Sequence, residues 1–445
     1  MCKTARTDHD SHARAPLKLI SVANTKDRYH LLNDPSVPRP NLNNPLHPVF
    51  RQANFTNSSS SLYYKMQPAL RLASMFLNSD SMLEWFVRPA FGKPLTDLQS
   101  GKVFLSDPNQ SSKHMEEMIA DVRVALICLS YCVQFQFVED LYCYALTQKD
   151  NRRCFRFPHW TPIFTSTHPT VIQIRGMSKS FLETDYESSS LCDRLRFDFL
   201  LATTIIHELT HAFGIMRRGD LKEPFYHLSD PQAELGWSWE EFALGGIFNP
   251  FDRASARISF LMRKVWLSDE VAYGSGGKEW TAVPMSWIAQ WFQISTWSKI
   301  AKDGPRVIDP PSSGLRIRCS GEGYFTIFAD NSSAIKDIQK LKMKVATLAC
   351  HLPMPTAAHA IMSTTTVQTA NKPTKITRDK NPNIVSMTCR VAEVVDRVGN
   401  SAAVELAVAP IPVKVLKRPL PTNVDDSDID SQKFETHPRR KRVKV

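Results

Sequence analysis

The sequence predicts an α+β protein dominated by helices with a small sheet, flanked by disordered N- and C-terminal segments. Apolar residues at helical spacing fill most of the chain between residues 61 and 305. Two runs of β-branched and aromatic residues interrupt them and predict strands. Outside this region the periodicity fades. The hydrophobic content of 42% is enough for the central part to form a core.

The first elements of the central region follow from its local patterns. Residues 60–91 predict short helices interrupted by prolines. Residues 114–146 predict one long helix with a broad apolar face. Strands are expected at about 154–165 and 170–176, where β-branched and aromatic residues gather.

The flanking parts of the chain differ from this central region in composition. Residues 1–60 are polar and rich in proline, and we expect a disordered lead-in before a domain that covers 61–305. Residues 306–351 predict a small appended segment with a hairpin around Gly321–Gly323. Residues 352–445 hold few large apolar side chains and predict a linker and a basic disordered tail.

Cysteine usage and the N-terminus predict an intracellular protein. The nine cysteines are scattered without a CxxC pair, which favours a reducing compartment. The N-terminus has no apolar region typical of a secretory signal. No uninterrupted apolar run approaches the length of a membrane span, so no membrane partner is expected.

Residues 190–219 predict one buried helix. Ser190 can cap its N-terminus, and Asp193 lies in the first turn, where a negative charge is favourable. Two arginines precede Gly219, which is typical of a helix C-terminus. Between these ends the helix is apolar nearly all round, as expected for a core helix.

This helix carries the stretch TTIIHELTHAFG. His207 and His211 are four residues apart, project from one face and can bind one metal ion together. Glu208 follows the first histidine, within reach of a metal-activated water without being a ligand. The motif therefore predicts a Zn²⁺ site of the catalytic type, with Glu208 as general base.

A catalytic zinc needs a third protein ligand. The metzincin pattern would require a histidine at position 217, where this chain has Arg217, so that pattern fails. His227 lies 16 residues after His211, a spacing that loosely resembles SprT-like proteases. It stays an alternative ligand.

A second helix offers better candidates. We expect it to begin at Asp230–Pro231 and to present glutamates on one face. Glu234 is the preferred third ligand, with Glu241 and Glu240 as alternatives. A glutamate that does not bind the metal can orient a ligand histidine.

HExxH followed by a glutamate on a later helix resembles the gluzincin arrangement of thermolysin-type peptidases. Residues 195–250 also resemble a group of uncharacterised filamentous-fungal predicted zinc peptidases. The resemblance implies a zincin-like fold, a Zn²⁺ cofactor and a peptide or protein substrate. It also implies an edge strand that pairs with extended substrate, and residues 170–176 are the candidate. Tyr226 and His227 are candidate donors to the transition state.

The C-terminal tail predicts a nuclear signal. Its basic cluster comprises Arg439, Arg440, Lys441, Arg442 and Lys444. A nuclear import receptor is therefore an expected partner, and the protein is expected in the nucleus. The core lacks interleaved basic and aromatic residues, so nucleic-acid binding is expected only weakly, through the tail.

Two other functions remain open from the sequence. The chain can be a catalytically inactive zincin that binds zinc and serves as an interaction module. It can also be a nuclear, nucleic-acid-associated protein in which the metal site only stabilises the fold. A zinc-dependent metallopeptidase is the leading interpretation.

Overall fold

The computed structural model describes residues 16–108, 114–151, 155–156, 166–250, 258–321, 325–350 and 385–389. It has the mixed α and β composition that the sequence predicts. Besides a helix over 16–23, the longer helices are α2 (Ser60–Asn78), α3 (Asp80–Phe91), α4 (Met115–Leu129), α5 (Gly176–Thr184), α6 (Leu191–Arg218), α7 (Leu235–Leu244), α10 (Ile294–Asp303) and α11 (Ser332–Cys350). The shorter ones are α8 (Asp269–Gly274) and α9 (Met285–Gln290).

The strands form several sheets. A three-stranded sheet contains β3 (Val133–Val138), β7 (Thr170–Arg175) and β4 (Ala145–Lys149) in that order. A six-stranded sheet has the order β13 (Val385–Cys389), β12 (Phe325–Ala329), β11 (Arg316–Cys319), β10 (Lys278–Ala282), β9 (Leu261–Lys264) and β8 (Ile247–Pro250). Two two-stranded sheets pair β1 (Pro94–Thr96) with β2 (Val103–Leu105) and β5 (Phe155–Arg156) with β6 (Ser166–Thr167).

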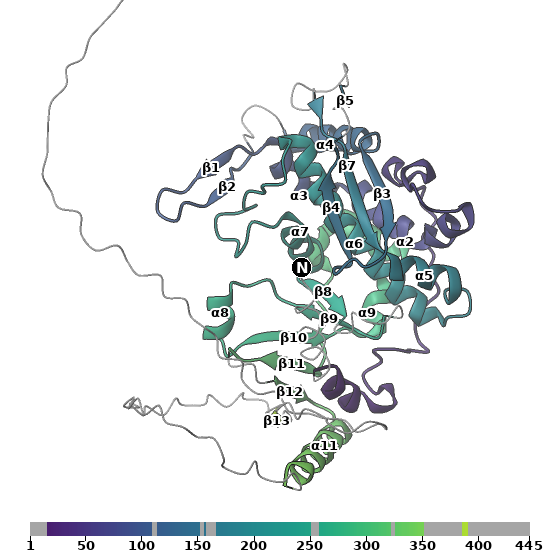
Figure 1. Ribbon diagram of the computed structural model, residues 1–445, viewed down its shortest axis with the longest axis vertical. Helices are drawn as coiled ribbons and strands as arrows, with labels where there is room; N and C mark the ends of the chain where they lie inside the picture. The colour runs from purple at the N-terminus through teal and green to yellow at the C-terminus, as the bar shows by residue number, and fades with distance from the viewer. Residues whose placement is uncertain are drawn as a thin grey trace, which may run out of the picture. The chain divides into compact units, whose positions relative to one another are not determined.

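Helix α6 is the central element of the larger core, and it begins and ends where the sequence predicts. The Ser190 hydroxyl accepts a hydrogen bond from the Asp193 backbone N–H at 3.1 Å, and Gly219 ends the helix with φ of 85°. The helix contacts α2, α3, α7 and α9 and strands β4 and β7 (Figure 1). Its side chains are buried on most sides, which confirms the prediction of a core helix.

The prediction of one helix over 114–146 is wrong beyond residue 129. Helix α4 ends at Leu129, and β3 and β4 follow. In β3 the sequence VQFQFV alternates between core and surface side chains, which is the period of a strand. The predicted interruption at prolines is also wrong, because α2 continues through Pro68 and α3 contains Pro89.

A second core joins the two flanking segments to the central domain. Leu19 and Ile20 from the helix over 16–23 pack with Ile317 of β11 and Ile338 of α11. Arg28 forms an ion pair with Asp337 at 2.6 Å. The N-terminal segment is therefore folded from residue 16, contrary to the predicted lead-in.

The predicted boundary at residue 305 also differs from the structure. Strands β11 and β12 continue the sheet that starts with β8, and they pair as the predicted hairpin. Residues 385–389 add the edge strand β13. Most of the predicted strand at 154–165 and the basic cluster at 439–444 lie outside the described residues, so the nuclear signal stays a prediction.

Helix α6 is also long and apolar enough to cross a membrane by length and composition alone. The sequence did not suggest such a stretch. Because 83% of this stretch is buried inside the protein, it has the character of a core helix.

One buried carboxyl group on α6 predicts a pH-dependent stability. The Tyr186 hydroxyl donates a hydrogen bond to Asp198 Oδ2 at 2.8 Å, while Oδ1 has no hydrogen-bond partner. Burial raises the pKa of Asp198 to about 8, although the Tyr186 hydrogen bond and the charge of Arg194 oppose this. Asp198 is therefore protonated in the folded protein at neutral pH.

The Asp198→Asn variant should remove this dependence. Between about pH 4, the pKa of an unfolded aspartate, and pH 8, the folded state holds a proton that the unfolded state lacks, so stability falls as pH rises. At pH 8 we expect the variant to exceed the wild type in unfolding free energy by at least about 1 kcal/mol. Urea unfolding at pH 5 and pH 8 measures this; parallel changes in both proteins would contradict it.

Candidate metal centre

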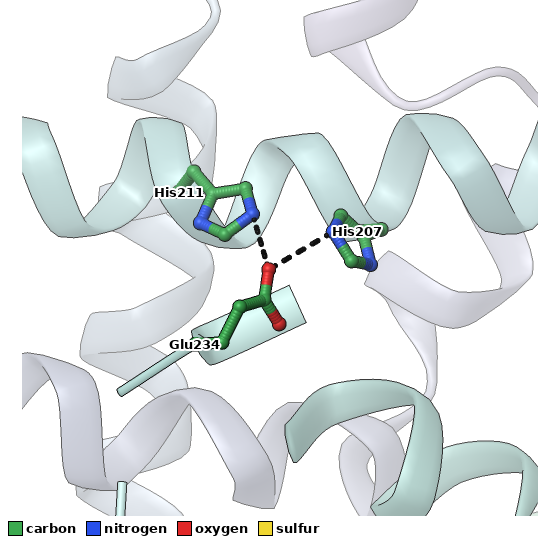
Figure 2. Close-up of side chains that lie close together, drawn as sticks. All are labelled: His207, His211 and Glu234. Carbon is green, nitrogen blue, oxygen red and sulfur yellow. Dashed lines mark ion pairs between the residues drawn. The ribbon is translucent and has the colours of Figure 1, made fainter. Parts of the chain in front are cut away.

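Helix α6 presents His207 and His211 on the side that faces the start of α7. The two imidazole rings lie 5.0 Å apart between centroids. Figure 2 shows both rings directed toward the carboxylate of Glu234. Both histidines are mostly buried, so their ring nitrogens need partners.

The Glu234 carboxylate joins the two histidines. Its Oε1 atom lies 3.1 Å from His207 Nε2 and 2.9 Å from His211 Nε2 (Figure 2). Helix α7 does not begin at Asp230–Pro231, as the sequence suggested, but at Leu235. Glu234 is its N-cap and accepts a hydrogen bond from the Trp237 backbone N–H. The cap geometry aims the other carboxylate oxygen at the histidines.

These three residues form a group that could hold a metal ion. One potential ligand atom from each of them lies within 4.8 Å of the others. Across the described part of the chain, no other set of histidine, cysteine, aspartate and glutamate residues meets this criterion. Of the four candidate third ligands, the structure brings Glu234 to the histidines.

Two further glutamates lie at the Nδ1 atoms of the two imidazole rings. Glu240 Oε1 lies 2.7 Å from His207 Nδ1, and Glu223 Oε1 lies 2.8 Å from His211 Nδ1. A carboxylate at Nδ1 keeps the proton on that nitrogen and leaves Nε2 free to bind a metal. Each glutamate also accepts a backbone N–H, Glu240 from Phe248 and Glu223 from Leu235. The ring orientations are therefore fixed from both sides.

The charges in this centre suit a cation. Burial alone would lower the pKa of His207, but Glu234 and Glu240 outweigh it and raise that pKa well above its usual value. Burial also opposes the charged form of His211, yet Glu223 and Glu234 raise its pKa to about 10. A divalent cation between the Nε2 atoms and Glu234 would replace two protons at this point.

The spacing of the donor atoms also fits a metal such as zinc. Zinc binds imidazole nitrogen and carboxylate oxygen at about 2.0–2.2 Å, which places tetrahedral ligands roughly 3.3 Å apart. The two N···O separations of 3.1 and 2.9 Å are only slightly shorter. Small movements of the side chains would open the site to the ion.

Glu208 is anchored by the neighbouring sheet. The Thr147 hydroxyl of β4 lies 2.7 Å from Glu208 Oε2 and 3.0 Å from the Glu208 carbonyl oxygen. Glu208 is 6% exposed, so this contact limits the positions of its carboxylate. Strand β4 and helix α6 thus fix the position of Glu208, the predicted general base.

Gly236 sets how closely α7 approaches His207. A Cβ atom at this position would lie 2.4 Å from His207 Nε2, which is closer than atoms can pack. The glycine stands in the first turn of α7, between Leu235 and Trp237. Only a residue without a side chain allows Glu234 to reach the histidines from this helix.

The other predicted site residues have different surroundings. Glu241 accepts a hydrogen bond from the Trp266 backbone N–H at 3.3 Å and does not belong to the group. The Tyr226 hydroxyl donates to the Trp85 carbonyl oxygen at 3.3 Å, and its ring stacks on that tryptophan. His227 is exposed and is not part of the group. The hydrogen bonds and ion pairs of the group join His207, His211 and Glu234 to none of these three residues.

The strand that was predicted to pair with substrate does not lie at an edge of its sheet. Residues 170–175 form β7, which is the middle strand between β3 and β4 and is not an edge. The edge strand on the α6 side is β4. Its second edge pairs with no strand among the described residues.

Sequence reasoning missed Glu223, Thr147 and Gly236. Glu223 and Thr147 lie in segments without a local motif, and only the folded chain brings them to α6. Gly236 carried a readable signal, because a glycine inside a helix is unfavourable unless another group approaches closely.

Comparisons of the chain with models of protein families, with curated proteins and with solved structures find no match.

The Glu240→Gln variant tests the hydrogen bond to His207 Nδ1. Removing the negative charge should weaken metal binding about 10-fold, because a neutral partner makes the imidazole less basic. Glu241→Gln is a matched control on the next residue, and it should bind metal like the wild type. Competition with a chromophoric chelator measures both affinities. Equal losses in the two variants would contradict a specific role of Glu240.

The Gly236→Ala variant tests the close approach of α7. The added methyl group must displace His207 or the start of the helix, so metal affinity should fall at least about 10-fold. Gly274→Ala is the control, since a Cβ atom there meets nothing within 4 Å. Metal content after dialysis at limiting free zinc reports the difference, and an unchanged content would show that the site tolerates the methyl group.

Proposed function

We propose that this protein is a zinc-dependent peptidase with a zincin-like arrangement, in which His207, His211 and Glu234 hold the metal. The observation that carries the proposal is the approach of both Nε2 atoms to one oxygen of Glu234. Structural zinc sites use four protein ligands, whereas three leave a position for water. A three-residue group beside a motif glutamate therefore favours catalysis over a structural role.

The donor set supports zinc among the common metals. Two imidazole nitrogens and one carboxylate oxygen are typical of catalytic zinc, while magnesium and calcium prefer oxygen ligands alone. The carboxylates at both Nδ1 atoms support the same choice, because they strengthen neutral imidazole as a ligand.

Glu208 is the proposed general base. When bound, zinc supplies the Lewis acidity that makes a water molecule a good nucleophile at neutral pH. Glu208 would take the proton from that water and pass it to the leaving amine. The Thr147 hydroxyl donates to Glu208 Oε2, which leaves Oε1 as the oxygen that can receive the proton. Thr147 is thus a positioning residue for this step.

The free edge of β4 is the proposed place for the substrate backbone. An extended peptide can add a strand to an exposed sheet edge through main-chain hydrogen bonds. Thr147 stands in this strand and contacts Glu208, so a peptide along β4 would pass beside the proposed base.

The Glu208→Gln variant separates metal binding from catalysis. It should keep one zinc per chain and lose peptide hydrolysis by at least about 100-fold, because glutamine cannot accept the proton. Glu234→Ala should lose both zinc and activity. Elemental mass spectrometry gives the zinc content, and mass spectrometry of digests of a denatured-protein mixture gives the hydrolysis.

The outcomes of this experiment distinguish the candidate functions. Zinc in the wild type without any hydrolysis would favour the inactive, zinc-binding module. Hydrolysis that survives in Glu208→Gln would exclude this residue as the base. A well-folded wild type that takes up no zinc would overturn the proposal.

A further inference from the structure

A hollow lies beside the C-terminal end of α6, outside the group that could hold the metal. It has a volume of about 230 Å³ and is lined by Pro89, Gly92, Pro94, Leu105, Arg217 and Arg218. The end of α3, the hairpin of β1 and β2, and the last turn of α6 provide these residues. The lining is apolar except for two guanidinium groups.

The guanidinium group of Arg218 has no partner in the protein. Its Nε, Nη1 and Nη2 atoms are all shielded from solvent, and none makes a hydrogen bond. A buried charged donor that is left unpaired destabilises the folded protein. Nearby Arg88, in contrast, donates to the Leu105 carbonyl oxygen and pairs with Asp107. Among the described residues, Arg218 is the arginine whose three guanidinium nitrogens are all buried and unpaired.

Arg217 adds a second positive charge to the hollow. Its Nε atom donates to the Ala90 carbonyl oxygen at 3.0 Å. Burial lowers the pKa values of both arginines, and for Arg218 the charges of Glu223 and Asp220 oppose this effect. Glu223 is already bound to His211, so it does not pair with Arg218.

The hollow is close to the candidate metal centre. Positions 207, 211, 214 and 218 recur at intervals of three and four, and they share one face of α6. A Cβ atom on Gly214 would lie 2.5 Å from Arg218 Nη2 and 3.3 Å from Leu235 Cδ1. The guanidinium group therefore folds back over Gly214, one turn from His211 and against the start of α7.

The favourable interaction of a positive charge with the C-terminal end of a helix explains the presence of these arginines but not their burial. A positive charge in the last turn stabilises a helix by interacting with its C-terminal carbonyl groups. An exposed arginine would do so without the cost of burial. These nitrogens are shielded from solvent where they lie against Gly214, so a ligand in the hollow can supply their acceptors only after the Arg218 side chain turns toward the hollow that it lines.

We infer that this hollow is an anion-binding subsite for a carboxylate group of a peptide ligand, held by Arg217 and by Arg218, whose side chain turns toward the hollow when the ligand binds. The planar guanidinium fork of an arginine matches the two oxygens of a carboxylate. The apolar lining suits a single charge carried on a hydrocarbon stem. The identification of the ligand as a peptide rests on the proposed peptidase function. The carboxylate can belong to an acidic side chain or to a peptide C-terminus.

Binding to the metal-free full-length protein tests the inference without requiring catalysis. The probes for calorimetry are acetyl-Ala-Glu-amide, acetyl-Ala-Gln-amide, acetyl-Ala-Ala with a free C-terminus, acetyl-Ala-Ala-amide and inorganic phosphate. We expect at least one carboxylate probe to bind 10-fold or more tightly than its neutral counterpart. The acidic-side-chain and C-terminal pairs identify the source of the carboxylate.

Variants of Arg218 show whether the preference arises in the hollow. Arg218→Met should abolish the preference and raise the midpoint of thermal unfolding, because it removes an unpaired buried charge. Arg218→Lys keeps the charge without the fork and should retain only part of the preference. The control is Arg194→Met, on the same helix beside Tyr186, and it should keep the wild-type preference for the charged peptides.

Three results would overturn the inference: equal binding of charged and neutral peptides, a preference that survives in Arg218→Met, or phosphate binding tighter than both carboxylate probes. Each can be obtained whether or not the protein hydrolyses peptides. A carboxylate preference in a protein without hydrolysis would preserve the subsite and reject the peptidase.

Discussion

The rest of the site depends on the interaction of the Glu234 carboxylate with His207 and His211. Its Oε1 atom lies between the Nε2 atoms of His207 and His211, and its Oε2 atom caps α7 at the Trp237 backbone N–H. One side chain thus fixes both the candidate metal ligands and the start of the neighbouring helix. Burial alone would raise the pKa of this carboxyl group, but His207 and His211 lower it well below its usual value, so the group stays ionised and able to bind a cation.

The contacts around the candidate metal centre couple helices α6 and α7 to each other. Helix α7 contributes Glu240 and allows the close approach at Gly236, while Glu223 connects His211 to the backbone of Leu235. A shift of α7 would therefore disturb both histidines at once. Arrangements of this kind place binding groups on rigid elements rather than on loops, and so hold them in position before a ligand arrives.

Local signals in the sequence were sufficient to predict α6, its caps and the placement of the two histidines on one face. A helix brings residues three and four apart in the sequence next to each other. The same reasoning was misled at residues 133–149, where strands follow α4 without a break in apolar content. It also could not identify Glu223 or Thr147, whose partners are 12 and 61 residues away. The N-terminal segment looked disordered because its apolar residues become buried only against distant parts of the chain. Leu19 and Ile20 pack with strands and a helix from residues 260–338, while Phe50 is buried in the core around α6.

The two sides of the second core are far apart in the sequence, and this separation affects the order in which the molecule folds. Arg28 and Asp337 form their ion pair across 309 positions of sequence, and residues 19–31 complete a core whose other members lie at 260–338. During synthesis the N-terminal helix would leave the ribosome long before its partners exist. The core around α6 can assemble first, and the second core closes only when the C-terminal strands arrive. Such a high contact order predicts slow, late docking of the N-terminal helix.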